Sequence, residues 1–195
     1  MTMKYDPEIH HRRTIRLRGY DYSSEGAYFV TICTQERERL LGEIDEDRLI
    51  LSDVGRVVDF WWRELPQHFE KIRLDVFTVM PNHIHGIIWL VGADRCVRPK
   101  GSRRYRADTS VCPYRAKPLS VVSLAKVVQW FKTMSANEYI RGMRENKWPI
   151  VTGRLWQRNY YEHIVRDEKE LYRIRQYVIE NPANWAKDED NPINW

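Results

Sequence analysis

The run from Met80 to Leu90 constrains this chain most, because two histidines one residue apart open a strongly apolar segment. Side chains on a β-strand alternate between its two faces, so His83 and His85 should present their imidazoles side by side. Imidazole is the commonest metal ligand among side chains, and Gly86 would let another group approach the backbone closely. We expect a strand that carries a candidate metal site, although a His-x-His pair alone is more often structural or solvated.

Two kinds of hydrophobic period place the other elements. Alternating or β-branched apolar runs predict strands, and apolar residues three and four apart predict helices. Pro81-Asn82 should form a tight turn that returns the histidine strand antiparallel to the preceding strand. Ser52 and Asp167 are suitable helix N-caps, and Pro66 and Pro182 should end two helices. We expect strands over 28–34, 48–51, 72–80 and 155–165, and helices over 54–65, 119–144 and 168–180.

The order of these elements predicts the fold class. A strand–helix–strand–strand–helix–strand order is the ferredoxin-like arrangement, an α+β fold with a four-stranded antiparallel sheet and helices on one face. A further C-terminal helix follows the last strand. We expect one domain over 1–195, with a basic N-terminal segment over 1–25 and a basic, mobile loop insertion over 93–118.

The composition limits the compartment and the partners. The 195 residues carry a net charge of +5, which is compatible with a polyanionic partner without proving one. The three cysteines, Cys33, Cys96 and Cys112, show no metal or redox spacing and suit a reducing compartment. The N-terminus is polar, and no stretch approaches the roughly 18–20 apolar residues that a membrane span needs. We therefore expect a cytoplasmic protein without a membrane partner.

Tyr177 and Asn181 form a second candidate site. They lie four residues apart in the last predicted helix, so they share the face that borders its apolar stripe. A phenol is a poor nucleophile at neutral pH until a base or a bound cation helps it to ionise. A divalent ion on His83 and His85 could supply that help. The amide oxygen of Asn181 is a sensible third ligand, which leaves positions open for phosphate oxygens and water.

These two stretches carry a family resemblance. Met80–His85 resembles the HUH motif of single-strand DNA nucleases, and Tyr177–Pro182 is similar to the tyrosine helix of the single-tyrosine HUH, or IS200-like, transposases. The chain resembles the REP-associated tyrosine transposases most. The resemblance spans most of 12–185. Three further stretches contribute to it: 16–22 running into 26–34, 128–133 and 155–164.

The resemblance implies a metal-dependent endonuclease and strand transferase (a transposase) for single-stranded DNA beside imperfect palindromic REP hairpins. The tyrosine, here Tyr177, would attack a phosphodiester and leave a 5′-phosphotyrosine and a free 3′-hydroxyl. Mg²⁺ or Mn²⁺ on His83, His85 and Asn181 would polarise the phosphate. Two alternatives stay open: a domesticated hairpin-binding module that does not cleave, and a metal nuclease that uses water. The protein could be a monomer or a homodimer that exchanges tyrosine helices.

Other residues compete for these roles or extend them. Tyr160, Tyr161 and Tyr172 are the rival nucleophiles. Arginines among aromatic residues suit single-stranded DNA, because cations follow the phosphates and rings stack on bases, although a solvated charge run is the simpler interpretation. The candidates for DNA contact are Arg12, Arg13, Arg16, Arg18, Arg103, Arg104, Tyr105, Arg106, Arg158 and His163.

Overall fold

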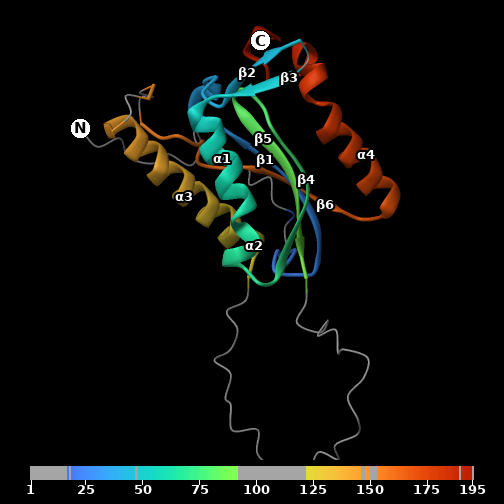
Figure 1. Cartoon of the computed structure of the whole chain (residues 1–195). Helices are drawn as coiled ribbons and strands as arrows, with labels where there is room; N and C mark the ends of the chain where they lie inside the picture. Colours follow the sequence, from blue (N-terminus) through green and yellow to red (C-terminus); the bar gives the residue numbers. More distant parts are fainter. Residues whose placement is uncertain are drawn as a thin grey trace, which may run out of the picture.

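A four-stranded antiparallel sheet forms the centre of the protein (Figure 1). This computed structural model describes residues 17, 19–46, 48–91, 122–145, 148–149, 153–188 and 190–194. The spatial order of the strands is β4-β5-β1-β6, which is the ferredoxin-like order and confirms the predicted fold class. The strands are β1 (Gly26–Cys33), β4 (Ile72–Val79), β5 (His83–Leu90) and β6 (Tyr161–Val165).

Two helices cover one face of this sheet, where the larger apolar core lies (Figure 1). They are α1 (Asp53–Arg63) and α3 (Leu124–Glu145). Ser52 caps α1 as predicted, since its hydroxyl accepts a hydrogen bond from the backbone N–H of Gly55 at 3.0 Å. Pro66 does not end this helix. The helix stops at Arg63, and Pro66 lies in the first turn of a short helix α2 (Leu65–His68), where a missing N–H costs little.

Gly86 allows a close approach, and the approaching group is part of this core. A Cβ at position 86 would lie 2.4 Å from the Cζ2 atom of Trp62, a fully buried side chain of α1. The Trp62 ring also stacks on Phe77 of β4, with the ring centroids 4.7 Å apart. The glycine therefore serves helix–sheet packing on the face opposite the histidines.

Helix α4 (Glu168–Glu180) covers the other face of the sheet. Asp167 caps it as predicted, because its carboxylate accepts from the backbone N–H of Glu170 at 2.8 Å. Val178 and Leu171 bury the apolar stripe of the helix against the sheet, in a second and smaller apolar cluster with Phe29 and Ile87. The chain continues through a 3₁₀ helix (Pro182–Lys187) and turns back over the end of the sheet that carries the histidines, where Asp190 contacts Asn82.

The predicted strand over 155–165 is wrong at its N-terminal half. Of the residues from 155 to 165, only those of β6 form a strand paired with β1, and Trp156 contributes one isolated bridge to Thr34. The ammonium group of Lys132 explains the difference. It donates to the carbonyl oxygens of Gln157 and Asn159 at 2.9 and 2.8 Å, so a side chain satisfies backbone groups that a strand ladder would otherwise use.

A small hairpin adds a second sheet that the sequence indicated only in part. It pairs β2 (Gly42–Asp45) with the expected segment β3 (Arg48–Leu51). The predicted basic loop over 93–118 and most of the basic segment over 1–25 lie outside the described residues. None of the helices in the described ranges combines the length and apolar character that a membrane span requires.

Candidate metal centre and tyrosine site

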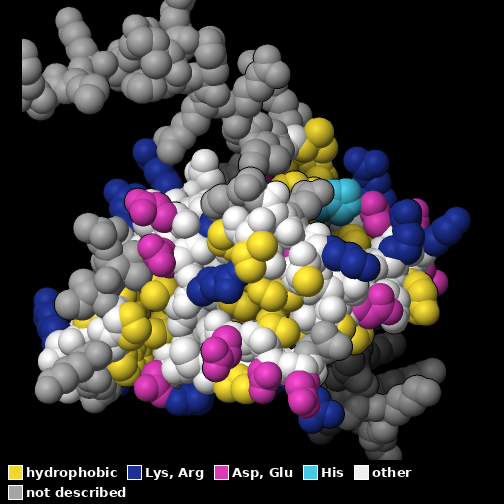
Figure 2. All heavy atoms as spheres, turned by 90° about the horizontal axis from the view of Figure 1, so that it is seen from above, with side chains coloured by type: hydrophobic (Ala, Val, Ile, Leu, Met, Phe, Trp, Pro, Cys, Tyr) yellow, Lys and Arg dark blue, Asp and Glu magenta, His cyan; other side chains and the backbone are white. Residues whose placement is uncertain are grey.

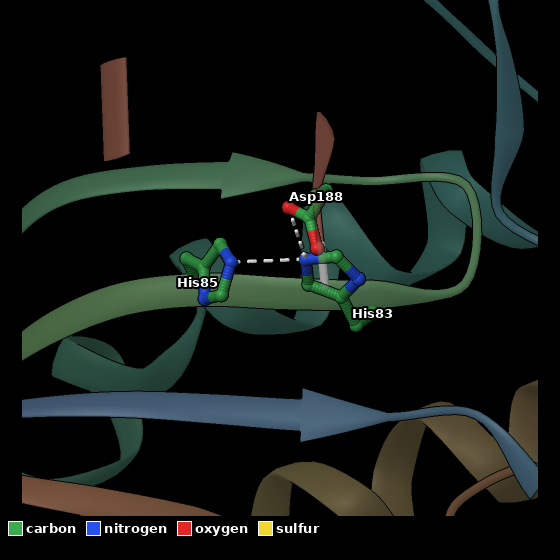
Figure 3. A group of neighbouring side chains, drawn as sticks. All are labelled: His83, His85 and Asp188. Atoms are coloured by element: carbon green, nitrogen blue, oxygen red, sulfur yellow. Dashed lines mark hydrogen bonds and ion pairs between the residues drawn. The ribbon is translucent and has the colours of Figure 1, made fainter. Parts of the chain in front are cut away.

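His83 and His85 point toward one another from β5, with their Nε2 atoms 2.9 Å apart (Figure 3). Both side chains are buried. Burial lowers the pKa of His85 to about 3 and holds the pKa of His83 well below its ordinary value, with the neighbouring imidazole adding to the effect at His83. Both rings are therefore neutral at pH 7, which is the state that binds a metal ion.

Asn82 fixes the tautomer of His83. The amide nitrogen of Asn82 donates to the carbonyl oxygens of Arg37 at 3.2 Å and Asp190 at 2.7 Å, which leaves its Oδ1 atom facing His83 Nδ1 at 2.8 Å. An amide oxygen can only accept, so Nδ1 of His83 carries the proton. The Nε2 atom of the same ring then presents a free lone pair to the centre of the site.

His85 has a more adaptable partner. Its Nδ1 atom lies 2.8 Å from the hydroxyl of Thr31 on β1, directly across the sheet. A hydroxyl can donate or accept, so either nitrogen of His85 can carry the proton. When Nδ1 carries it, both Nε2 lone pairs of the histidine pair face each other, and a cation between them would relieve that repulsion.

Asp188, which no motif or spacing in the sequence indicated, joins the pair from the C-terminal segment. Its Oδ2 atom lies 4.0 Å from Nε2 of His83, and the three candidate ligand atoms all lie within 4.8 Å of one another (Figure 3). Several contacts hold the segment in place: the Arg37–Asp190 ion pair, the hydrogen bond from Asn82 to Asp190, and the hydrogen bond from Arg39 to Asn191 at 2.9 Å.

Tyr177 reaches the same centre from α4. Its hydroxyl oxygen lies 3.3 Å from Nε2 of His85, and the residue is 48% exposed. It stands in the wall of a cavity of about 900 Å³ that His85, Asn181 and Asp188 also line. The tyrosine is thus open to a ligand that enters the cavity while its hydroxyl lies beside the histidine pair.

The groups around the cavity fit a divalent cation. An octahedral ion with ligands at roughly 2.1 Å needs neighbouring donor atoms about 3 Å apart, which agrees with the histidine spacing of 2.9 Å. Asn181 is buried, and its Oδ1 atom has no hydrogen-bond partner within the described part of the chain, so it is an available oxygen donor. The cavity is also lined by the carboxylates of Glu180, Asp188 and Asp190. Because these negative charges repel a phosphate, a phosphate could enter the cavity only with a bound cation beside it.

An ion pair and hydrogen bonds fasten helix α4 to the sheet. The guanidinium of Arg175 donates to the carboxylate of Asp75 on β4 through Nε at 3.0 Å and a terminal nitrogen at 2.6 Å. The indole nitrogen of Trp89 donates to the same carboxylate at 3.0 Å. We call this ion pair the Asp75–Arg175 clamp. It fixes the position of α4 over the sheet, and with it the position of Tyr177, which follows Arg175 by two residues.

The rival nucleophiles occupy different positions. Tyr172 is 64% exposed and lines none of the cavities described here. Tyr160 and Tyr161 line the same large cavity as Tyr177. Cys33 lines it too, but burial raises the pKa of its thiol to about 12, so the thiol stays protonated and unreactive.

Two of the predicted DNA contacts fall in the described part of the chain. Arg158 lines a cavity between α3 and the 153–160 segment, and His163 lies on β6 facing α4. On the face seen in Figure 2, side chains of both charge signs are interleaved with hydrophobic ones. The other candidates lie outside the described residues: Arg12, Arg13, Arg16, Arg18, Arg103, Arg104, Tyr105 and Arg106.

Comparisons with known proteins found two relatives in sequence. An uncharacterised protein of Haemophilus influenzae is 39% identical over 189 residues, which cover 97% of this chain and 98% of the relative. A second H. influenzae protein, provisionally named a REP-associated tyrosine transposase, is 24% identical over 84% of this chain and 73% of its own. No protein-family model matches the chain.

The fold recurs in a solved structure of a REP-associated tyrosine transposase bound to a REP hairpin. The TM-score is 0.54 at 15% sequence identity, and the match covers 89% of this chain and 76% of the other. The fold of this chain is therefore similar to that of a REP-associated tyrosine transposase. In sequence, the chain is a distant relative of the protein named a REP-associated tyrosine transposase.

Proposed function

We propose that this protein is a metal-dependent single-stranded DNA endonuclease and strand transferase that acts beside REP-type hairpins through a 5′-phosphotyrosine. The single observation that carries the proposal is the position of the Tyr177 hydroxyl, 3.3 Å from Nε2 of His85 in a cavity open to solvent. The hairpin as substrate is supported by the related transposase that was solved with a REP hairpin.

In this reaction the oxygen of Tyr177 forms a bond to phosphorus, and the bond from phosphorus to the 3′-oxygen breaks. The phenol loses its proton, and the departing strand end leaves as a 3′-hydroxyl. Another 3′-hydroxyl can reverse the step and rejoin a strand. Burial of the histidines keeps their rings neutral, and the Asp75–Arg175 clamp keeps the tyrosine at the cavity wall.

His83, His85 and Asp188 would hold Mg²⁺ or Mn²⁺, with the amide oxygen of Asn181 as a further donor. Bound there, the ion would draw negative charge from a phosphoryl oxygen and favour ionisation of the phenol. Calorimetric titration with Mn²⁺ tests this ligand set. Asp188→Asn and Asn181→Ala should each weaken binding, and a site that ignores both changes would be built from the histidines alone.

A denaturing gel tests the reaction. Labelled hairpin oligonucleotides from the repeats that flank the gene are incubated with wild type or Tyr177→Phe, in Mn²⁺ or in EDTA. The proposal predicts a slow, covalent species only with wild type and Mn²⁺, while Tyr177→Phe still binds the hairpin. Cut strands without an adduct in both proteins would instead indicate a metal nuclease that uses water. Binding without cutting would indicate a hairpin-binding module.

A further inference from the structure

A second groove runs between β6 and α4 and meets the tyrosine cavity. It has a volume of about 360 Å³. The residues that matter are Phe29, Tyr161, His163, Glu170, Arg173 and Tyr177. Phe29, Tyr161 and Tyr177 line both this groove and the larger cavity, so the two adjoin, and the tyrosine nucleophile of the proposed function stands between them.

Tyr161 gives the groove an exposed aromatic wall. The residue is 45% exposed at the N-terminal end of β6, an edge strand of the sheet. The ring meets Phe29 edge-to-face, with the centroids 6.3 Å apart, and Phe29 meets Tyr177 in the same way at 6.0 Å. Exposed rings beside a phosphate-handling site suit nucleotide bases, because every base can stack on an aromatic face.

The two polar parts of the groove differ in character. His163 and Glu170 pair at 2.8 Å, and the second carboxylate oxygen of Glu170 accepts from the backbone N–H of Arg166 at 2.8 Å. The negative charge of Glu170 repels a phosphate, so the part of the groove beside His163 and Glu170 suits a base. Arg173 is exposed and lies on the same side of α4 as Tyr177, four residues away, where a guanidinium can meet a phosphate.

We propose that this groove is a nucleotide subsite for the single strand that passes the nucleophile, with one base stacked on Tyr161 and an adjacent phosphate bound by Arg173. The inference rests on the proposed function and adds the path of the strand. It predicts that the protein distinguishes a hairpin that carries a single-stranded flank from the same hairpin without one.

Fluorescence anisotropy in EDTA measures this binding without cleavage. The probes are the labelled hairpin with an oligothymidine flank and the same hairpin with blunt ends. Tyr161→Ala should weaken binding of the flanked probe by roughly 5- to 100-fold and leave the blunt probe unchanged, and Tyr161→Phe should stay close to wild type. Tyr172→Ala is the matched control, since that ring is exposed on the same helix as the nucleophile and outside the groove.

Arg173→Ala supplies an independent variant. It should reduce the slope of log affinity against log salt by about one for the flanked probe only. The subsite is refuted if Tyr161→Ala binds the flanked probe as wild type does, or if it weakens both probes equally. Because these measurements need no cleavage, a wild-type protein that binds through Tyr161 but forms no adduct would overturn only the proposed reaction.

Discussion

The clamp between Asp75 and Arg175 should control the rate of adduct formation at Tyr177, although neither residue takes part in the reaction. The carboxylate of Asp75 accepts three side-chain hydrogen bonds, two from Arg175 and one from Trp89, and so ties α4 to two strands of its own sheet. Arg175→Met and Asp75→Asn each remove the charged pair while keeping similar side-chain volume. We expect both variants to fold and to position Tyr177 poorly.

The exposures of the two side chains set the size of the effect. Exposed ion pairs are worth about 0.2–1 kcal/mol, and hydrogen bonds to buried charged groups about 1.5–3 kcal/mol. Asp75 keeps 12% of its side chain exposed and Arg175 keeps 40%, so solvent screens the pair on one side only. We expect a coupling free energy of about 1 kcal/mol between the two positions, and a fall in the rate of adduct formation of about tenfold or more, since small misplacements are costly.

The coupling free energy between Asp75 and Arg175 should depend on pH with a definite sign. Burial alone would raise the pKa of Asp75, but hydrogen bonds from Arg175 and Trp89 outweigh it and hold the pKa below its ordinary value of about 3.9. A carboxyl whose pKa is lower in the folded state stabilises the fold above the unfolded pKa and loses that contribution as the pH falls through the folded value. The coupling should therefore stay constant from neutral pH to about pH 5 and shrink below about pH 4.

A double-mutant cycle in urea unfolding measures the coupling free energy, and adduct kinetics measure the positioning. Arg166, an exposed arginine just before α4, offers a matched control through Arg166→Met. A coupling near zero at pH 7, or adduct formation at the wild-type rate in Asp75→Asn and Arg175→Met, would refute the assignment of this clamp as the device that positions the tyrosine helix.

Three further predictions concern the support of the site. Asn82→Ala removes the acceptor that fixes His83, so Mn²⁺ affinity measured by calorimetry should fall roughly 10- to 100-fold, and unchanged affinity would contradict the tautomer argument. Gly86→Ala forces a Cβ against Trp62, so urea unfolding should show a loss of about 1–3 kcal/mol, and wild-type stability would contradict it. Burial lowers the pKa of Lys132 to about 8, so the stability of wild type relative to Lys132→Met should rise between about pH 8 and 10, and a flat difference would show that the ammonium is solvated.

Much of the fold could be predicted because local patterns and the global fold agree. The Pro81-Asn82 turn joins two apolar strands, and the caps at Ser52 and Asp167 mark helix starts that the structure confirms. The errors arise where side chains replace expected backbone pairing. The Lys132 ammonium binds the two carbonyl oxygens that would have extended β6. The two contacts span 25 and 27 positions of the sequence, so no local period can reveal them.

The candidate site could be predicted in part from the sequence for the same reason. His83 with His85, and Tyr177 with Asn181, are local pairs whose spacing places each pair on one face of a strand or helix. Asp188 has no such spacing, because it reaches the histidines through a 3₁₀ turn that folds back over the sheet. The only hint in the sequence is an acidic run soon after the aromatic residue Trp185, which the structure shows to be buried near His83.

Locating the covalent bond tests the central claim most directly. The adduct formed with Mn²⁺ and a labelled hairpin is digested with nuclease and trypsin, and the peptides are analysed by mass spectrometry. Cleavage after lysine and arginine places Tyr177 alone in the peptide Gln176–Lys187, apart from Tyr160 and Tyr161 in Asn159–Arg166 and from Tyr172 in Glu170–Arg173. A nucleotide on the peptide Gln176–Lys187 is the predicted result. A nucleotide on either other peptide, or cut DNA without any modified tyrosine, would contradict the account.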